Sequence, residues 1–519
     1  MKNRIDKYTY YWQAIFLAAV ILFVSACQKE KVEQPVITGV VNYAASPNDT
    51  VVTTIQTGQW VVLLGHNLSG VRQVYFGSVP ARINTALFSD ESLVVQLPDI
   101  PFESVPADEL NTVTAISEGG TATFNINIIG APLITRVRNN ETSPNDTVVN
   151  VLYPGDEINI VGYNLQNATE ISFQGIAADL SKVVYTDTSA IVQVPADLSG
   201  SNALLANTIT YTTEVGSTNF SIKIVGPPVI SYISLEVPHE GDMVHLYGYN
   251  FTAIQNFTFA GTEITDYEVS ADESVLSFVS PALLQSGPVE IITQAGSFTT
   301  AYNVNDIAFI NSGGVGILAN MEWGDYFGWG WGNGDVNLYS SDPNSDWPSY
   351  NTDYGVGYGM YLVYKSVPLA AGEDGYLEDW GGNQILIGDG GGQWVPSENL
   401  DDSGDKWALK FEMNVTKPWS GGTLCFRTQS ASTYIARYEP WRVSVSKSVT
   451  VTTDGWQTVT IPLSSFRLED GEGDSISKVS DLLDASSGKT YFRIYLHNYR
   501  TSTTDNFEAA FDNFRVVRR

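Results

Sequence analysis

The sequence predicts an all-β protein built from several small sandwiches in tandem. Its 519 residues exceed what one hydrophobic core organises, since domains of about 100–200 residues are usual. Apolar and polar residues alternate over many short segments, as in half-buried strands, and one such pattern recurs along the chain. Charged residues make up only 16% of the chain, and long Ala-, Glu-, Lys- and Leu-rich helical stretches are absent. We therefore expect repeated sandwiches followed by a C-terminal β domain of a different kind.

The N-terminal residues have the composition of a bacterial export signal. Three basic residues precede an apolar run over residues 14–24, which is shorter than the about 20 residues of a membrane-spanning helix. The run leads into Val-Ser-Ala-Cys, ending at Cys27, which resembles the bacterial lipobox, whose cysteine is acylated and becomes the mature N-terminus. We predict a signal peptide over residues 1–26, a lipid anchor at Cys27 and a polar tether over residues 27–34.

The charge and the cysteine content exclude several classes of protein. The formal net charge is -30, and nucleic-acid binding depends on Lys and Arg neutralising phosphates, so we expect no nucleic-acid partner. Besides Cys27 the chain has one cysteine, Cys425, so the mature protein cannot form an intramolecular disulfide and must be stabilised by packing. The four histidines are too scattered along the sequence for a His-rich metal site.

Residues 35–306 contain three copies of one strand-rich unit. In each copy two glycines stand seven residues apart and enclose alternating apolar positions, which predicts a half-buried strand. The second glycine begins a Gly-x-Asn sequence, which suits a tight turn because Gly and Asn tolerate positive φ. The glycine pairs are Gly58 and Gly65, Gly155 and Gly162, and Gly241 and Gly248. The predicted domains cover residues 35–131, 132–227 and 228–306.

Two further features connect these copies with a known family. Each copy starts with Pro-x-Ile, at Pro35, Pro132 and Pro228. Each also contains a strand that ends in Phe shortly before a glycine, at Gly77, Gly175 and Gly261. Together with the Gly-x-Asn turn, these sequences resemble IPT/TIG-type immunoglobulin-like domains, and the resemblance implies three tandem immunoglobulin-like β-sandwiches. Because the junctions are short and contain proline, we interpret the region as a stiff spacer.

Residues 307–519 form a different predicted domain. Ten of the twelve tryptophans lie there. Alternating strands are expected over residues 407–413, 455–461 and 491–496. The last strand, over residues 510–517, resembles those that close carbohydrate-binding β-sandwich modules of the jelly-roll type. We expect one such sandwich, with Trp407 and Trp456 in its core because aliphatic residues alternate with them.

Other tryptophans of this domain stand among Gly, Pro, Asn and Asp, which predicts loops, and loops lie on the surface. Exposing such rings forfeits about 25 cal/mol per Å² of apolar area, so we expect a function for them. An aromatic ring matches the apolar C–H face of a sugar, and polar side chains match its hydroxyl rim. The glycan-binding candidates, in order of preference, are Trp347, Trp380, Tyr350, Trp394, Trp331 and Trp329.

The succession of lipoprotein signal, immunoglobulin-like spacer and tryptophan-rich terminal domain resembles the surface glycan-binding proteins, of the SGBP-B type, of Sus-like polysaccharide-utilisation systems. This resemblance implies an outer-membrane lipoprotein that faces the cell surface. It further implies capture of a neutral plant β-glucan, such as xyloglucan or mixed-linkage β-glucan, beside a TonB-dependent importer and a surface endo-glycanase.

Two other functions remain open from the sequence. A surface endo-glycanase would need two carboxyl groups about 5–9.5 Å apart. Acidic pairs such as Glu322 with Asp325 exist, but none has the Glu-x-Asp-x-x-Glu spacing of β-jelly-roll glucanases, so we predict that the protein is not an enzyme. An adhesin would instead bind a partner through the immunoglobulin-like domains.

No cofactor and no metal site are expected, and the sequence leaves open whether a structural Ca²⁺ ion is bound. Its candidate ligands are Asp512 or Asn513, because acidic residues near the final strand bind calcium in some carbohydrate modules. No multi-oxygen calcium loop accompanies them.

Overall fold

The structure, a computed structural model, describes residues 32–519 with several gaps. It does not describe residues 187, 199–206, 307–314, 320, 322–327, 332–335, 341–359, 375–383, 388–392, 429–431, 485–487 and 491, nor the side chains of residues 328–331, 336–340, 360 and 492. The expected signal peptide and the anchor at Cys27 lie outside the described residues. Within them, no helix is long and apolar enough to cross a membrane. The helical segments described are short 3-10 turns such as η1 (Leu180–Lys182), and the prediction of an all-β fold is confirmed.

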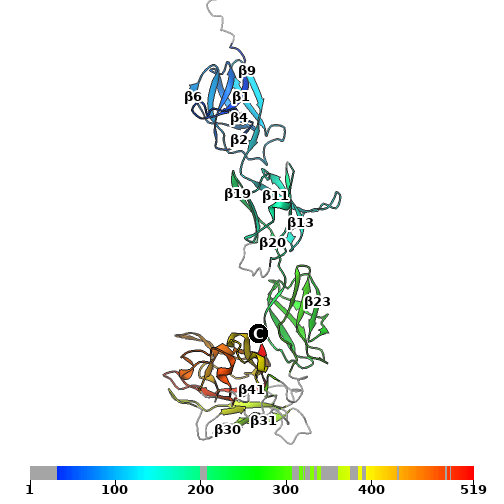
Figure 1. The fold of residues 1–519 in the computed structure, drawn as a ribbon, viewed down its shortest axis with the longest axis vertical. Helices are drawn as coiled ribbons and strands as arrows, with labels where there is room; N and C mark the ends of the chain where they lie inside the picture. The colour runs from blue at the N-terminus through cyan, green and yellow to red at the C-terminus, as the bar shows by residue number, and fades with distance from the viewer. Residues whose placement is uncertain are drawn as a thin grey trace, which may run out of the picture. The chain divides into compact units, whose positions relative to one another are not determined.

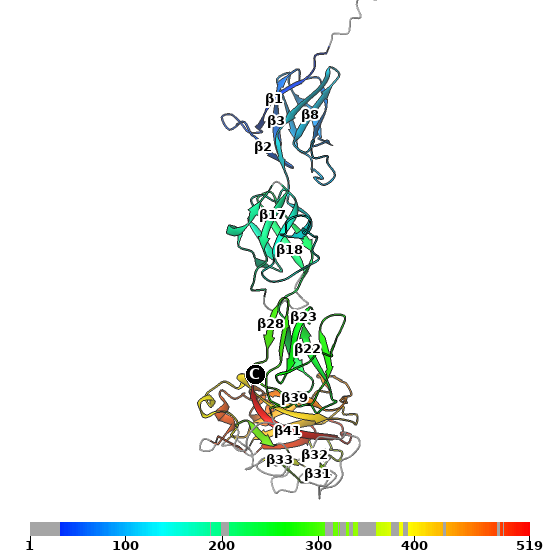
Figure 2. The ribbon, with the colours of Figure 1, turned by 90° about the vertical axis from the view of Figure 1, so that its right-hand side faces the viewer.

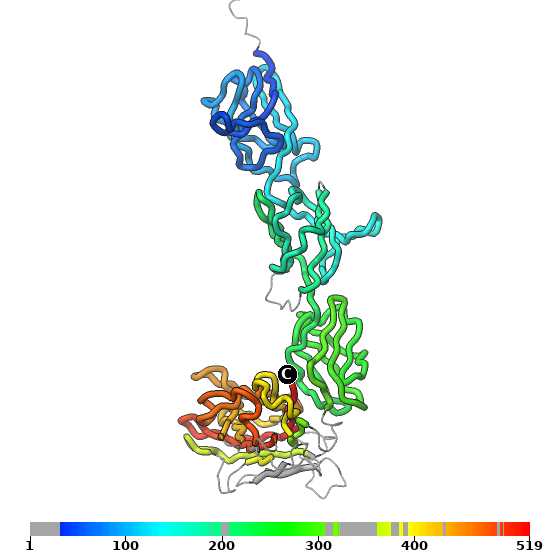
Figure 3. The backbone as a smooth tube through the Cα atoms, in the orientation of Figure 1, coloured from blue at the N-terminus to red at the C-terminus, as the bar shows by residue number. Residues whose placement is uncertain are grey.

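The first sandwich, drawn in blue in Figures 1 and 3, consists of two four-stranded sheets and a parallel strand pair. One sheet contains, in spatial order, β1 (Val36–Asn42), β3 (Trp60–His66), β7 (Ser92–Gln96) and β6 (Ile83–Phe88). The other contains β5 (Val79–Pro80), β4 (Val71–Phe76), β8 (Thr112–Ser117) and β9 (Gly120–Asn125). The parallel pair consists of β2 (Thr54–Gln56) and β10 (Asn127–Ile129).

The second sandwich repeats this architecture. Its first sheet contains β11 (Leu133–Asn139), β13 (Glu157–Tyr163), β17 (Ser189–Gln193) and β16 (Val184–Tyr185). Its second sheet contains β15 (Ile176–Ala177), β14 (Glu170–Phe173), β18 (Thr208–Thr213) and β19 (Gly216–Ser221). The parallel pair consists of β12 (Val151–Leu152) and β20 (Lys223–Ile224).

The third sandwich keeps the two four-stranded sheets. The first contains β21 (Val229–Ile233), β22 (Met243–Tyr249), β26 (Val275–Val279) and β25 (Glu268–Val269). The second contains β24 (Thr262–Glu263), β23 (Ile254–Phe259), β27 (Glu290–Thr293) and β28 (Gly296–Thr299). The same strand order in all three copies follows from the same spacing of glycines and apolar residues.

The second glycine of each repeat lets two strands approach closely. A Cβ atom at Gly65, Gly162 or Gly248 would lie 1.8–1.9 Å from a backbone oxygen of the neighbouring strand, so no other residue fits there. The asparagines two residues later have φ values of 59°, 56° and 62° at Asn67, Asn164 and Asn250. Asparagine tolerates this left-handed conformation better than most residues. The predicted Gly-x-Asn turn is therefore confirmed in all three copies.

The C-terminal domain consists of two larger sheets. The six-stranded sheet contains β31 (Val336–Ser340), β32 (Met360–Lys365), β41 (Glu508–Arg518), β34 (Trp407–Asn414) and β39 (Gln457–Pro462), and β29 (Ile317–Ala319) also pairs with β41. The five-stranded sheet contains β30 (Gly328–Trp331), β33 (Gln384–Ile387), β40 (Phe492–His497), β35 (Thr423–Thr428) and β36 (Ile435–Tyr438). A small hairpin joins β37 (Arg442–Ser444) to β38 (Lys447–Ser448).

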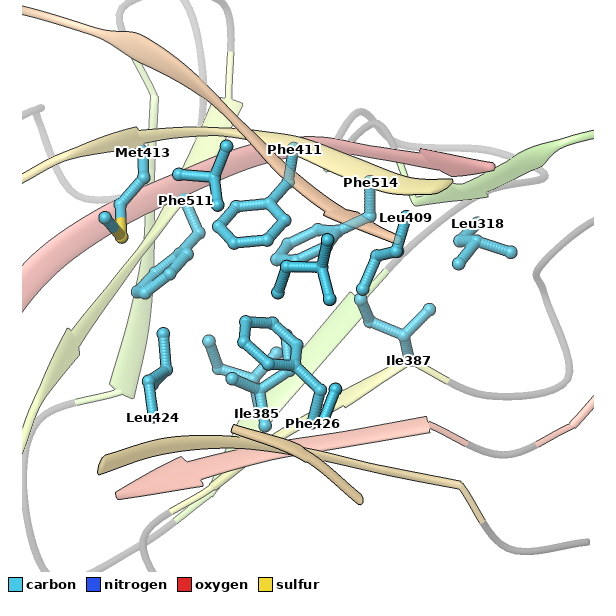
Figure 4. Packing of buried hydrophobic residues seen from close by; sticks show 14 of the residues in the cluster. Leu318, Ile385, Ile387, Leu409, Phe411, Met413, Leu424, Phe426, Phe511 and Phe514 are labelled. Atoms are coloured by element: carbon cyan, nitrogen blue, oxygen red, sulfur yellow. The ribbon is translucent and has the colours of Figure 1, made fainter. Parts of the chain in front are cut away.

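The hydrophobic core of this domain lies between its two sheets. Figure 4 shows Phe411, Phe511 and Phe514 of the six-stranded sheet pointing toward Ile385 and Phe426 of the five-stranded sheet. The rings of Phe411 and Phe426 approach to 5.3 Å between centroids. Trp407 belongs to the same core and is 6% exposed, so its predicted core position is confirmed.

The third sandwich and the C-terminal domain share one compact unit, Val225–Arg519. The core of the sandwich continues into Tyr361, Val363, Trp456 and Ala510, which come from the six-stranded sheet and the residue before β39. Strands β22, β39 and β41 can be located in Figure 2. Trp456 is 5% exposed, so its predicted burial is confirmed, but the core that it joins is the one shared with the third sandwich.

Candidate functional site

The outer face of the six-stranded sheet is covered by the third sandwich through a cluster of buried charges. Lys410 Nζ donates a hydrogen bond to Glu236 Oε1. Arg515 Nη2 donates to Glu236 Oε2 at 3.1 Å, and Arg515 Nη1 donates to Glu412 Oε2 at 2.8 Å. All four side chains are at most 4% exposed. Burial lowers the pKa of Lys410 and raises the pKa of Glu412, because both lose hydration. The third sandwich therefore prevents a ligand from reaching this part of the sheet.

The five-stranded sheet has its own outer face, turned away from the core. Ile385 of β33 belongs to the core cluster, so its neighbours Gln384 and Leu386 lie on the opposite face. Strand β30 pairs with β33 so that Trp329 is opposite Leu386 and Trp331 is opposite Gln384. Directly opposite residues in an antiparallel pair belong to the same face of the sheet. Positions 329 and 331, both predicted candidates, therefore belong to the outer face.

Polar residues continue this outer face across the central strand β40. Arg493 and Tyr495 pair in register with Leu386 and Gln384. Arg493 Nη1 donates a hydrogen bond to Gln384 Oε1 at 3.0 Å. Gln384, Arg493 and Tyr495 are all at most 4% exposed, and burial raises the pKa of the Tyr495 phenol. The outer face is therefore buried along β33 and β40, and among the described residues it becomes partly exposed toward Arg437, His497 and Tyr499.

A partly exposed aromatic and cationic cluster lies toward the β35 and β36 side of this face. The Arg437 guanidinium stands 3.6 Å from the centroid of the Tyr499 ring. Arg437 Nε donates to the carbonyl oxygen of Asp470 at 2.6 Å, and Nη1 donates to Glu472 Oε1 at 2.7 Å. The His497 ring lies 3.8 Å from the Tyr499 ring between centroids. Burial raises the pKa of Tyr499, so its phenol remains neutral and able to donate.

Three of the six predicted candidates, Trp347, Tyr350 and Trp380, lie outside the described residues. Trp380 stands four residues before Gln384 in the sequence, and Gln384 pairs with Trp331. The role of all three residues stays a prediction.

The expectation that Trp329 and Trp331 stand in a loop is wrong, because residues 328–331 form the edge strand β30. Alternation of glycine with tryptophan has a period of two and therefore fits a strand as well as a loop. Gly330 pairs with Ile385, so the glycines occupy the face that is turned toward the core. Positions 329 and 331 therefore belong to a regular β-strand and not to a loop.

The expectation that Trp394 is exposed is also wrong. Its side chain is 1% exposed and packs with Val395 in the core between the sheets. Backbone hydrogen bonds hold this segment against its neighbours, from Gly316 N to Gln393 O at 2.6 Å and from Trp394 N to Gly488 O at 3.3 Å. The glycine run before Trp394 indicated a loop, but the chain turns into the core directly after it. Trp394 therefore does not contribute a binding ring.

Sequence reasoning missed the polar residues of the outer face. Arg493, Tyr495 and His497 alternate along β40 with residues such as Ile494. This period-two pattern was available in the sequence, but it predicts only which residues share a face. Gln384 had no signal of its own, because its position follows from the pairing of β33 with β30.

In the part of the chain that the structure describes, no three His, Cys, Asp or Glu residues are grouped to hold a metal ion. Asp512 and Asn513 are 3% and 7% exposed within β41, and Asn513 N donates to Asp512 Oδ1 at 2.7 Å. A calcium ion at these residues stays a prediction. The acidic pair Glu322 and Asp325 lies outside the described residues.

Residues 310–518 match the family model of the surface glycan-binding protein B xyloglucan binding domain. Over 546 aligned residues, which cover 99% of both chains, the protein is 24% identical to an IPT/TIG domain-containing protein of Bacteroides ovatus. A crystal structure with a xylogluco-oligosaccharide aligns with a TM-score of 0.53 and 20% identity, covering 93% of this chain and 99% of that one. An SGBP-B from a complex xyloglucan utilization locus in Bacteroides uniformis has a TM-score of 0.39 and 20% identity, covering 75% of this chain and 100% of that one.

Proposed function

We propose that the protein captures a plant β-glucan at the bacterial cell surface without cleaving it, because residues 310–518 match the family model of the surface glycan-binding protein B xyloglucan binding domain. This family match is the observation that carries the proposal. The relative solved with a xylogluco-oligosaccharide shares the fold and favours xyloglucan as the first ligand to test. Mixed-linkage β-glucan is the second.

We assign the glucan to the β30 edge of the outer face of the five-stranded sheet, because Gln384, Arg493 and Tyr495 next to this edge are at most 4% exposed. The third sandwich covers the outer face of the other sheet at its buried charges, whereas the edge strand β30 brings two tryptophan positions to this one. The proposed rings are those of Trp347, Trp380, Tyr350, Trp331 and Trp329. Each stacked ring contributes about 1 kcal/mol, so several rings with hydrogen bonds give micromolar affinity.

The proposal includes a location and neighbours. A surface glycan-binding protein acts at the cell surface, and the Val-Ser-Ala-Cys sequence supports acylation of Cys27 and anchoring in the outer membrane. The captured polymer would pass to a TonB-dependent importer and a surface glycanase beside it. Replacing Cys27 by Ser should release the protein from the membrane fraction, as measured by fractionation and blotting.

Affinity electrophoresis of the chain from residue 28 to residue 519 tests the binding. The whole chain is needed, because the isolated C-terminal domain would expose the charges that Glu236 neutralises. Gels containing xyloglucan, mixed-linkage β-glucan, mannan or xylan should show retardation in at least one β-glucan. The double variant Trp347→Ala, Trp380→Ala should be retarded less, corresponding to a loss of more than about tenfold in affinity.

The matched control is Trp60→Ala in the first sandwich, where the ring is 44% exposed, and it should bind normally. Unchanged mobility in every gel would count against glycan capture. Release of reducing sugar from the same polymers would identify the protein as an endo-glycanase instead. An adhesin that uses its immunoglobulin-like domains would keep its partner in the Trp347→Ala, Trp380→Ala double variant.

A further inference from the structure

One sheet of the third sandwich carries exposed aromatic and apolar side chains on its outer face. Tyr232 lies on β21, Met243, His245 and Tyr247 alternate along β22, and Val279 ends β26. Tyr232 and Tyr247 are 38% and 40% exposed, and Met243 and Val279 are more than half exposed. Tyr232 is directly opposite Tyr247, and Met243 is opposite Val279. These five residues therefore form one continuous surface, which we call the tyrosine face.

The rings of the tyrosine face form a row. The centroids of Tyr232 and Tyr247 are 5.7 Å apart with 30° between the ring planes, and the His245 ring lies 6.1 Å from Tyr247. His245 Nδ1 is 2.7 Å from the Ser277 hydroxyl oxygen, so polar groups border the rings. Tyrosine offers a large contact area with few rotatable torsions, so it loses little entropy on binding. The face thus combines apolar plates with hydrogen-bonding groups.

The fold of the repeat does not require these rings. The three first sheets have the same register, and the equivalent pairs are Gly39 with Leu64, Arg136 with Val161, and Tyr232 with Tyr247. The first two sandwiches form the same sheet without any aromatic residue at these two positions. The tyrosine pair is therefore a feature of the third sandwich alone. The contact with the C-terminal domain uses the Tyr232 hydroxyl but not the exposed ring of Tyr247, and exposed apolar surface that neither the repeat nor this contact needs indicates a binding partner.

The charge of the tyrosine face narrows the class of partner. The chain carries a formal net charge of -30, yet the five residues of the face include no Asp, Glu, Lys or Arg. Among the described residues paired across this face, Glu268 on the edge strand β25 supplies a carboxylate, opposite Ser277. A cationic partner would be expected to meet an acidic surface, and a nucleic acid a basic one. A neutral, hydroxyl-rich ligand fits the face as it is.

The tyrosine face is continuous with the contact between the third sandwich and the C-terminal domain. The Tyr232 hydroxyl donates a hydrogen bond to the carbonyl oxygen of Thr458 on β39, at 3.1 Å. Burial raises the pKa of Tyr232, so the phenol remains a donor at neutral pH. The face is therefore fixed to the domain to which we assign glucan capture.

We propose that the tyrosine face is a second binding surface for a segment of neutral β-glucan. This inference rests on the proposed function, because it takes the ligand class from the C-terminal domain. Two weak surfaces in one compact unit raise the retention of a long polymer beyond that of either surface, because the second contact is made at high effective concentration.

Methionine methyl signals provide a local test in the chain from residue 28 to residue 519. Of its four methionines, Met243 lies in the tyrosine face, whereas Met321 and Met413 are 0% and 1% exposed. With ¹³C-methyl methionine labelling, a xyloglucan oligosaccharide should shift the Met243 signal saturably, and Met243→Leu assigns that signal. Tyr247→Ala should weaken the apparent affinity at this signal about tenfold. Tyr247→Phe keeps the ring and should retain the shift.

Two further variants separate the possible causes. Val161→Ala changes the equivalent position of the second sandwich and should leave the Met243 shift unchanged. The Trp347→Ala, Trp380→Ala double variant should also keep the shift, because it changes only the other site. Tyr232→Phe removes the hydrogen bond to Thr458 but keeps the ring, so a retained shift shows that the ring acts directly.

The outcomes distinguish this inference from the proposed function. Retardation in xyloglucan gels without any Met243 shift overturns the inference and leaves the proposed function intact. A shift that persists with full affinity in Tyr247→Ala also overturns it. A Met243 signal that changes with protein concentration in the absence of sugar would show that the face binds a second copy of the chain. Absence of both retardation and shift removes the proposed function and the inference together.

Discussion

Replacement of Glu236 by alanine probes the unit formed by the third sandwich and the C-terminal domain. The Glu236 carboxylate accepts hydrogen bonds from Lys410 and Arg515, and these three side chains are at most 4% exposed. With Glu412 the cluster contains two cationic and two anionic side chains, so their charges balance. In the variant one positive charge remains in excess where water has no access. We therefore expect a loss of stability and release of the proton from Lys410, whose pKa burial already lowers.

The expected magnitude follows from the solvation of buried charges. Removing one partner of a buried ion pair costs about 3–5 kcal/mol, because the other partner stays dehydrated. A loss of about 3 kcal/mol reduces the folding equilibrium constant more than about 100-fold. In the variant Lys410 binds a proton more tightly when unfolded than when folded. The stability of the variant should therefore rise as the pH increases toward the unfolded pKa of about 10.4, and its deficit should shrink.

Guanidinium unfolding of the chain from residue 28, followed by tryptophan emission, measures this effect. Ten of the eleven tryptophans that remain without Trp12 lie in the C-terminal domain. The control is Lys478→Ala, since Lys478 pairs with Asp401 at 2.7 Å but the two side chains are 47% and 84% exposed. Exposed pairs contribute about 0–1 kcal/mol. If the loss in Glu236→Ala is no larger than in the control, the charges are hydrated and the reasoning fails.

Three further predictions concern single residues. Burial raises the pKa of the Cys425 thiol to about 12, so Ellman's reagent should label the native chain from residue 28 no faster than it unfolds; rapid labelling would show an open site. A Cβ at Gly162 would lie 1.9 Å from a backbone oxygen, whereas one at Gly39 would meet nothing within 4 Å. Calorimetry should therefore show that Gly162→Ala destabilises the second sandwich by more than about 2 kcal/mol and Gly39→Ala leaves the first nearly unchanged; equal shifts would contradict this. The Trp407 indole N–H donates to Asp402 at 3.0 Å and, with Lys406, lowers the pKa of Asp402 to about 2. This bond stabilises the fold above pH about 4 and is lost as the pH falls toward 2, so the stability advantage over Asp402→Asn in denaturant titrations should shrink over that interval, and a constant difference would refute it.

The fold was largely predictable because each immunoglobulin-like repeat carries two local requirements of the backbone. The glycines at Gly65, Gly162 and Gly248 are required by close strand approach, and the following asparagines adopt positive φ. Such local requirements act within a few residues and leave a visible spacing in the sequence. The alternation that predicted strands in the C-terminal domain has the same local origin.

The site was predictable only in part. Whether a residue lies in a strand and whether it is buried depends on contacts with segments distant in the sequence, which local patterns do not reveal. Glycines beside Trp331 and before Trp394 indicated loops in both places, yet the first lies in an edge strand and the second is buried in the core. The alternation of Lys410 and Glu412 with core residues correctly separates two faces of β34. Their face is nevertheless buried, because another domain covers it. No spacing in the sequence connects Glu236 with residues so distant along the chain.

Because the third sandwich and the C-terminal domain share a core, they must be exchanged together when domains are recombined between proteins. Trp456 and Val363 complete the core of a sandwich that precedes them in the chain. A chimaera that grafts residues 307–519 onto a foreign spacer would lose this partner, and a third sandwich without the C-terminal domain would expose the same apolar residues. Recombination, in the laboratory or in evolution, should therefore succeed when the exchanged module begins near Val225, and fail when it begins at the tryptophan-rich segment.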